Sequence, residues 1–84
     1  MAYTITFSRS ALRHFRSLPR QVQERLQPRI DALAEDPRPP GVIKLQGRVD
    51  EYRIRVGNYR VIYQIQDDVL VVSVIDVGHR RDIY

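Results

Sequence analysis

The clearest structural pattern in the sequence is EYRIRVGNYRVIYQIQ, residues 51 to 66. Apolar and polar residues alternate along both halves, which is typical of β-strands with one buried face. Gly57 and Asn58 separate the halves, and both tolerate the positive φ angles that a two-residue hairpin turn needs. The sequence therefore predicts an antiparallel hairpin of Glu51 to Val56 with Tyr59 to Gln66.

A two-residue turn also sets the register of this hairpin, because the pairs follow by counting outward. The predicted pairs are Val56 with Tyr59, Arg55 with Arg60, Ile54 with Val61, Arg53 with Ile62, and Tyr52 with Tyr63. Arg53, Arg55 and Arg60 then share the open face of the sheet. Directly opposed like charges destabilise a sheet, and an anion bound between them removes the repulsion. The alternative is a solvated face whose charges are screened by salt.

The N-terminal half predicts one strand and two helices. Ala2 to Phe7 alternates as a strand, and Ser8 then caps a helix that ends at Pro19. A second helix runs from Arg20 to Glu35 and is bent at Pro28. Its apolar stripe consists of Val22, Leu26, Ile30 and Leu33.

The remaining segments complete the fold. Asp36 to Gly41 is rich in proline and predicts a stiff, exposed connection to a short strand around Val42 to Leu45. After a turn at Asp67 and Asp68, the β-branched run from Val69 to Val77 predicts an interior strand. We expect a single domain over residues 1–84 of the α+β class. Its pattern is βααβββ, with two N-terminal helices packed on one face of a largely antiparallel sheet.

Composition narrows the class of protein. Lys and Arg number 14 against 10 Asp and Glu. All of these cations except Lys44 are arginine, whose planar fork matches phosphate oxygens. The absence of cysteine excludes a disulfide framework and a thiolate metal site. There is no apolar run of membrane-spanning length and no secretory signal, so we expect a cytoplasmic protein without membrane association.

Reactive side chains gather in the tail GHRRDIY, residues 78 to 84. Counting outward from the turn at Asp67 and Asp68 places Tyr59 opposite Asp76, so the tail is predicted to leave the sheet beside the arginines. It then brings proton-transfer groups and further positive charge to a phosphate-sized site. The tail residues near Arg55 and Arg60 are His79, Arg80 and Tyr84.

Each tail residue also has a plainer interpretation. The plainer interpretation of His79 is an ordinary surface histidine. Its place after Gly78 and beside the arginines is what favours a role in proton transfer. Tyr84 is a candidate either for catalysis or for stacking on a nucleobase. His14 lies on the helix face away from the apolar stripe, and we assign it no role.

Other chemistries lack their motifs. The sequence has no glycine-rich phosphate loop, no histidine pair at metal-ligand spacing and no nucleophile elbow. Asp67 and Asp68, the carboxylates most suited to a metal, fall at the turn farthest from His79. We therefore expect no metal and no cofactor. Proton-transfer groups beside a cluster of arginines suit cleavage of a phosphodiester without a metal. Such cleavage indicates RNA as the substrate, because the ribose 2′-OH is a built-in nucleophile that DNA lacks.

Three segments in order resemble the RelE/ParE superfamily of toxins from toxin-antitoxin systems. They are residues 44–47 (KLQG), residues 52–63 (YRIRVGNYRVIY) and residues 77–84 (VGHRRDIY). The resemblance covers essentially the whole chain and implies a RelE-like fold. It also implies an endoribonuclease that cuts messenger RNA in the ribosomal A site by 2′-OH attack, leaving 2′,3′-cyclic phosphate and 5′-OH ends.

The resemblance also implies roles for particular residues. Basic residues on the sheet would hold the phosphate, and a proton would pass between the RNA and Tyr84 or His79, in either order. Some relatives have lysine at two of these positions, where arginine keeps the charge but donates no proton. The implied catalytic residues are Arg60, His79, Arg80 and Tyr84. The implied RNA- and phosphate-binding residues are Lys44, Arg53, Arg55 and Arg81.

A toxin of this kind has a neutralising partner, so the resemblance implies a cognate RelB-like antitoxin that masks the arginine face, in addition to mRNA and the ribosome. Two other functions stay open. A ParE-type toxin has the same fold and inhibits DNA gyrase, although such members generally lack the catalytic tail. A non-catalytic RNA-binding module would use its arginines for phosphates and its tyrosines for stacking.

Overall fold

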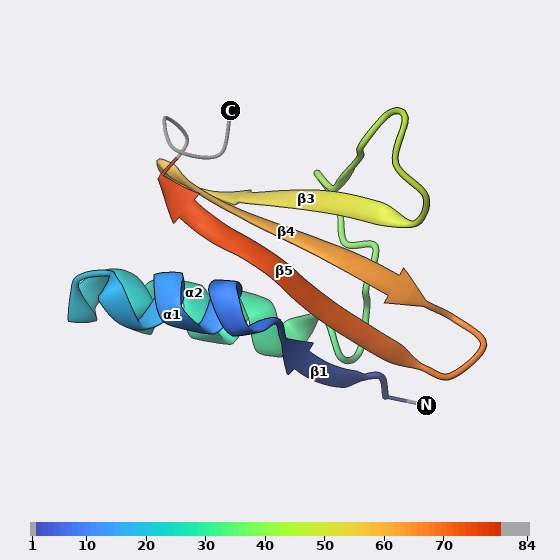
Figure 1. Ribbon diagram of the computed structural model, residues 1–84, viewed down its shortest axis with the longest axis horizontal. Helices are drawn as coiled ribbons and strands as arrows, with labels where there is room; N and C mark the ends of the chain where they lie inside the picture. The colour runs from blue at the N-terminus through green and yellow to red at the C-terminus, as the bar shows by residue number, and fades with distance from the viewer. Residues whose placement is uncertain (1, 80–84) are drawn as a thin grey trace.

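The computed structural model describes residues 2–79 and contains two helices and a five-stranded sheet. Both helices lie on one face of the sheet (Figure 1), as predicted. The elements are β1 (Thr4–Phe7), α1 (Arg9–Ser17), α2 (Arg20–Ala32), β2 (Ile43–Lys44), β3 (Glu51–Val56), β4 (Tyr59–Gln66) and β5 (Val71–His79). The short predicted strand near residue 43 is thus a true fifth strand, β2, at the sheet edge.

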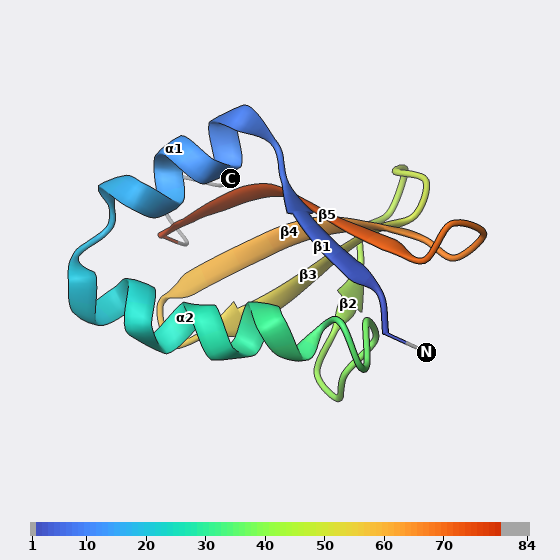
Figure 2. The same cartoon turned by 90° about the horizontal axis from the view of Figure 1, so that it is seen from below.

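The sheet has the strand order β1-β5-β4-β3-β2. β1 runs parallel to β5, and the other neighbours are antiparallel, which confirms the largely antiparallel sheet. Viewed from below, α1 lies near β5 and α2 lies toward β3 (Figure 2). The open face of the sheet is therefore left uncovered by either helix.

Sequence and structure agree for the first helix. The Ser8 side chain accepts a hydrogen bond from the Ala11 N–H (3.1 Å), which is the predicted N-terminal cap. The helix ends before Pro19, with Leu18 as its C-cap. Ser8 also donates to the carbonyl oxygen of Ile75 (3.2 Å), which ties the start of α1 to the edge of β5.

The second helix is shorter than predicted. It contains Pro28 as expected but ends at Ala32 instead of Glu35. The backbone tightens there, and the Ala34 carbonyl oxygen accepts a hydrogen bond from the Tyr3 N–H (2.7 Å). A hydrogen bond to the N-terminal segment thus takes the place of a further helical turn. The sequence around Ala34 does not reveal this distant partner.

The connection after α2 is less exposed than predicted. Pro37 is buried, and its carbonyl oxygen accepts a hydrogen bond from the Tyr63 hydroxyl (2.7 Å). Because a buried carbonyl needs such a partner, this bond fixes the segment against the sheet. The predicted stiff, exposed connection is therefore wrong at Pro37.

The core lies between the sheet and the two helices. The predicted stripe of α2 is confirmed, since Leu26, Ile30 and Leu33 are buried and Val22 is packed against them. The inner face of the sheet contributes Tyr52, Ile54, Val56, Val61, Tyr63, Ile65, Val72, Val74 and Val77. All five predicted β3–β4 pairs are also present.

The register of β4 with β5 differs from the prediction. The connection is a four-residue turn over residues 67–70, so Gln66 pairs with Val71, and a bulge at Ile75 adds one more residue to β5. Tyr59 consequently lies opposite His79, three residues beyond the predicted Asp76. The predicted two-residue turn at Asp67 and Asp68 is therefore wrong.

Candidate nucleic-acid interface

Two neighbouring rows of residues cross the open face at the end where the β3–β4 turn lies. One row is Arg55, Arg60 and Gly78, on β3, β4 and β5 in turn. The other row is Arg53, Ile62 and Asp76. This places the three predicted sheet arginines on one surface, and directly opposed arginines stand next to a residue without a side chain.

The arginine surface is partly enclosed. Ile62 points to the open face, away from the main core, yet it is only 5% exposed. The Nε atom of Arg60 is also buried. Charge placed near these groups is less screened than on a fully solvated surface, so this surface suits the binding of an anion.

His79 belongs to β5, so the strand ends two residues later than the sequence predicts. Its ring meets the ring of Tyr59 edge to face, with centroids 5.4 Å apart. Tyr59 packs against the core, whereas Arg60, the next residue, lies on the open face. His79 therefore reaches the same end of the sheet as Arg60 but points to the helix side.

The other predicted site residues separate into two groups. Arg80, Arg81 and Tyr84 lie outside the described residues. Lys44, on edge strand β2, pairs with Tyr52 of β3 and therefore lies outside the row of Arg55 and Arg60. It belongs to a different part of the surface.

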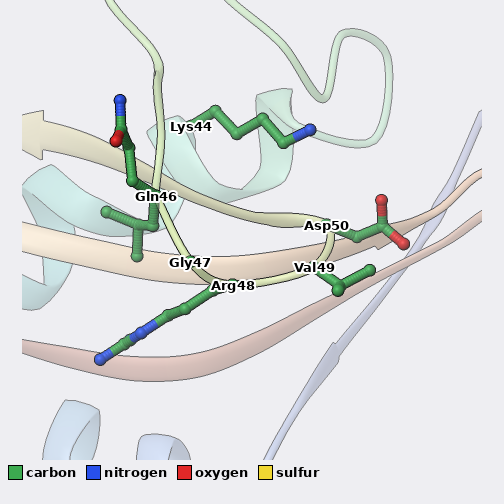
Figure 3. Close-up of a pocket in the computed structure, with 7 residues that line it drawn as sticks. Lys44, Gln46, Gly47, Arg48, Val49 and Asp50 are labelled. Atoms are coloured by element: carbon green, nitrogen blue, oxygen red, sulfur yellow. The ribbon is translucent and has the colours of Figure 1, made fainter.

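Lys44 lines a hollow of about 540 Å³ formed by residues 44–50, at the opposite end of β3. Figure 3 shows the side chains of Lys44 and Arg48 pointing in different directions across this loop. Arg48 is also paired with Glu51 (3.3 Å). The two cations of this loop thus do not converge on one position for an anion.

His14, to which we assign no role from the sequence, forms a hydrogen bond with Asp76 (Nδ1 to Oδ1, 2.9 Å). The same Asp76 oxygen accepts from the N–H of Val77 (2.9 Å). β1 pairs with β5 only as far as Val74, and the second bond satisfies one backbone N–H of β5 beyond that point. The contact joins α1 to the sheet.

A third polar cluster lies at the far end, around Asp67. Arg38 donates two hydrogen bonds to its carboxylate (3.2 and 2.8 Å), and the Tyr3 hydroxyl donates a third (2.6 Å). The bonds from Arg38 and then from Tyr3 hold the pKa of Asp67 at about 2, below its ordinary value. Within residues 2–79, no group of three or more His, Asp or Glu side chains is placed to hold a metal.

Sequence reasoning missed two arginines beside the hairpin turn, Arg25 and Arg29 of α2. Arg29 lines a hollow with Arg55 and Gly57, and the guanidinium of Arg25 lies against Gly57. Their spacing of four residues was the available signal, because it places both on one side of the helix.

No helix among the described residues is long and apolar enough to cross a membrane.

The model of a known family, the ParE toxin of type II toxin-antitoxin systems, matches residues 5–84. The chain is 39% identical over 83 residues to the mRNA interferase toxin RelE of Escherichia coli (strain K12), covering 96% of this chain and 86% of RelE. It is 31% identical over 88 residues to a putative RelE-like toxin of Escherichia coli, covering 100% of this chain and 92% of that protein.

Solved structures show the same similarity. RelE in the intact Escherichia coli RelBE toxin-antitoxin complex superposes with a TM-score of 0.83 at 38% identity, covering 93% of this chain and 96% of that one. The archaeal RelE–RelB complex from Pyrococcus horikoshii gives 0.84 at 31% identity, covering 98% and 99%. The chain therefore belongs to the RelE/ParE superfamily of toxins.

Proposed function

We propose that this protein is a toxin endoribonuclease, an mRNA interferase. The observation that carries the proposal is the direct pairing of Arg55 with Arg60 on the open face, in a chain that is 39% identical to an mRNA interferase. The pair concentrates positive charge where a phosphodiester gains negative charge in the transition state. Arg53 extends the same surface toward the RNA backbone.

The proposed reaction uses the RNA as its own nucleophile. The 2′-OH attacks the adjacent phosphorus and the bond to the 5′-oxygen breaks, leaving a 2′,3′-cyclic phosphate and a 5′-OH. Arg55, Arg60 and Arg80 offset the charge that develops on the phosphoryl oxygens. This assignment requires no metal, since the arginines provide the charge and the substrate provides the nucleophile.

Two protons must move in this reaction, one from the 2′-OH and one to the leaving 5′-oxygen. We assign these transfers to Tyr84 and His79, with the order between them open. The pairing of His79 with Tyr59 adds a condition. His79 points to the helix side, whereas Arg60 lies on the open face. For both residues to reach the reacting phosphodiester, the leaving oxygen must lie at the end of β5, beyond Gly78.

The same proposal extends to partners. The relatives in solved complexes are bound to RelB antitoxins, and we propose that a RelB-like antitoxin neutralises this chain. An acidic or amphipathic segment of such a partner would mask the arginine surface. We further propose that the toxin acts in the cytoplasm, on mRNA in the ribosomal A site.

The test is a reaction of purified protein with mRNA, with and without programmed ribosomes, followed by mapping of cut sites and end groups. Reactions without ribosomes contain excess chelator. We expect cyclic-phosphate and 5′-OH ends. A folded protein that arrests growth, cuts no RNA in either reaction and inhibits supercoiling by gyrase would instead act as a ParE-type toxin.

A further inference from the structure

Three arginines from two elements surround the hairpin turn. Arg29, Arg55 and Gly57 line one hollow of about 440 Å³ between α2 and β3. The Arg25 guanidinium touches the same turn, since its terminal nitrogen lies 2.6 Å from where a Cβ on Gly57 would stand. The Nε of Arg55 donates to the carbonyl oxygen of Gly57 (3.3 Å). Arg25 and Arg55 thus flank a single glycine.

Arg25, Arg29 and Arg55 stand apart from the ion pairs of the described residues. The ion pairs of residues 2–79 join other groups, and none of them includes Arg25, Arg29 or Arg55. Contacts to one glycine hold Arg25 and Arg55 within about 10 Å, the Debye length at 0.1 M salt, so their repulsion is not fully screened. An anion in the hollow converts this repulsion into attraction.

The hollow is also open to a long ligand. β2 pairs with β3 only at Tyr52 and Arg53, so no strand within residues 2–79 covers the β3 edge at Ile54, which lines the hollow. Gly41 forms part of the wall, and no described atom beyond its chain neighbours lies within 4 Å of where its Cβ would stand, so a ligand can approach the backbone there.

We propose that Arg25, Arg29 and Arg55 form a second phosphate-binding site, which takes the RNA phosphate next to the one held by Arg55 and Arg60. Arg55 belongs to both sites, so the positive surface continues from the open face around Gly57 onto α2. This continuity favours a phosphate backbone over an acidic peptide, because repeated phosphates follow such a track and arginine forks match them. The inference rests on the proposed function.

The test compares Arg25→Gln/Arg29→Gln with a charge-matched control, Arg13→Gln/Arg16→Gln, which removes two exposed arginines from α1. Fluorescence anisotropy measures binding of a short 2′-O-methyl RNA, which lacks the nucleophile, between about 50 and 200 mM salt. Loss of one phosphate contact reduces the magnitude of the negative slope of log K against log salt by about 0.7 in the α2 variant. The control retains the wild-type slope.

Steady-state cleavage provides a second readout. Because the site binds a phosphate that does not react, the α2 variant should raise KM with kcat unchanged. Equal slopes for wild type and the α2 variant, or an equal fall in the control, would overturn the second site. So would an α2 variant that binds RNA normally but loses affinity for an acidic antitoxin segment. If the α2 variant shows the predicted slope change but the wild-type protein cuts no RNA, only the proposed function is contradicted.

Discussion

Arg55 and Arg60 lie directly opposite each other in the β3–β4 ladder, on the face that no helix covers. Opposed like charges weaken a sheet, so this pair opposes folding while it serves anion binding. Replacing Arg55 should therefore separate the two properties.

We expect Arg55→Gln to raise the free energy of unfolding by about 0.2–1 kcal/mol, because one of the two facing charges is removed. Denaturant unfolding at low salt measures this gain. Cleavage of mRNA should fall in the same variant. A less stable Arg55→Gln protein with full activity would contradict the assigned role of the pair.

Arg60→Ala should lower kcat for mRNA cleavage by on the order of 10²–10³, the usual cost of losing one group that stabilises transition-state charge. Arg13→Ala, which removes an exposed arginine of α1, is the matched control and should cut at the wild-type rate. Single-turnover kinetics on programmed ribosomes gives the comparison. Equal rates for both variants would remove Arg60 from the mechanism.

Tyr63→Phe should destabilise the protein by about 1–3 kcal/mol, because the buried carbonyl of Pro37 loses its donor. For a domain of this size that lowers Tm by about 4–8 °C per kcal/mol. Tyr59→Phe removes a hydroxyl from a half-buried ring whose oxygen has no hydrogen bond in residues 2–79, and should change Tm little. Similar Tm losses in both would show that the Pro37 bond contributes nothing.

The hydrogen bonds to Asp67 predict a pH dependence of stability. Its folded pKa of about 2 lies below the ordinary value near 3.8, so its contribution is present above pH 4 and is lost as pH falls toward 2. Asp67→Asn should unfold at a lower temperature than wild type at neutral pH, with the difference vanishing near pH 2. Asp68→Asn removes the same charge without touching Arg38 and is the control. A constant Asp67→Asn difference across this range would refute the coupling.

Gly57 is constrained both by its backbone conformation and by its contact with Arg25. Its φ of +61° favours glycine, and a Cβ would stand 2.6 Å from the Arg25 guanidinium. Gly57→Ala should cost about 1–2 kcal/mol from the left-handed backbone alone. Adding Arg25→Ala removes the contact, so the double variant should be more stable than the sum of the single losses by at least 0.5 kcal/mol. Strict additivity in denaturant unfolding would exclude the contact.

Local pattern was sufficient for the β3–β4 hairpin. A glycine-asparagine turn of two residues leaves one register, so the opposition of Arg55 and Arg60 follows from counting. The cap at Ser8 and the stripe of α2 are equally local and were also predictable.

The errors arise where distant contacts decide. The bulge at Ile75 has no signature in β5 itself, and it accompanies the bond from Ser8 to the Ile75 carbonyl, 67 positions away. With the four-residue turn, it displaced His79 to a position opposite Tyr59. Arg25 and Arg29 were missed for the same reason, because only the packing of α2 beside the hairpin brings them to Gly57.

The most direct test of the central claim replaces the 2′-OH at one mapped cut site with hydrogen and measures cleavage of that message on programmed ribosomes. If the ribose 2′-OH is the nucleophile, cleavage of this bond is abolished, while the unmodified message yields cyclic-phosphate ends. Continued cleavage of the 2′-deoxy bond would contradict it, because the nucleophile would then come from water or from the protein.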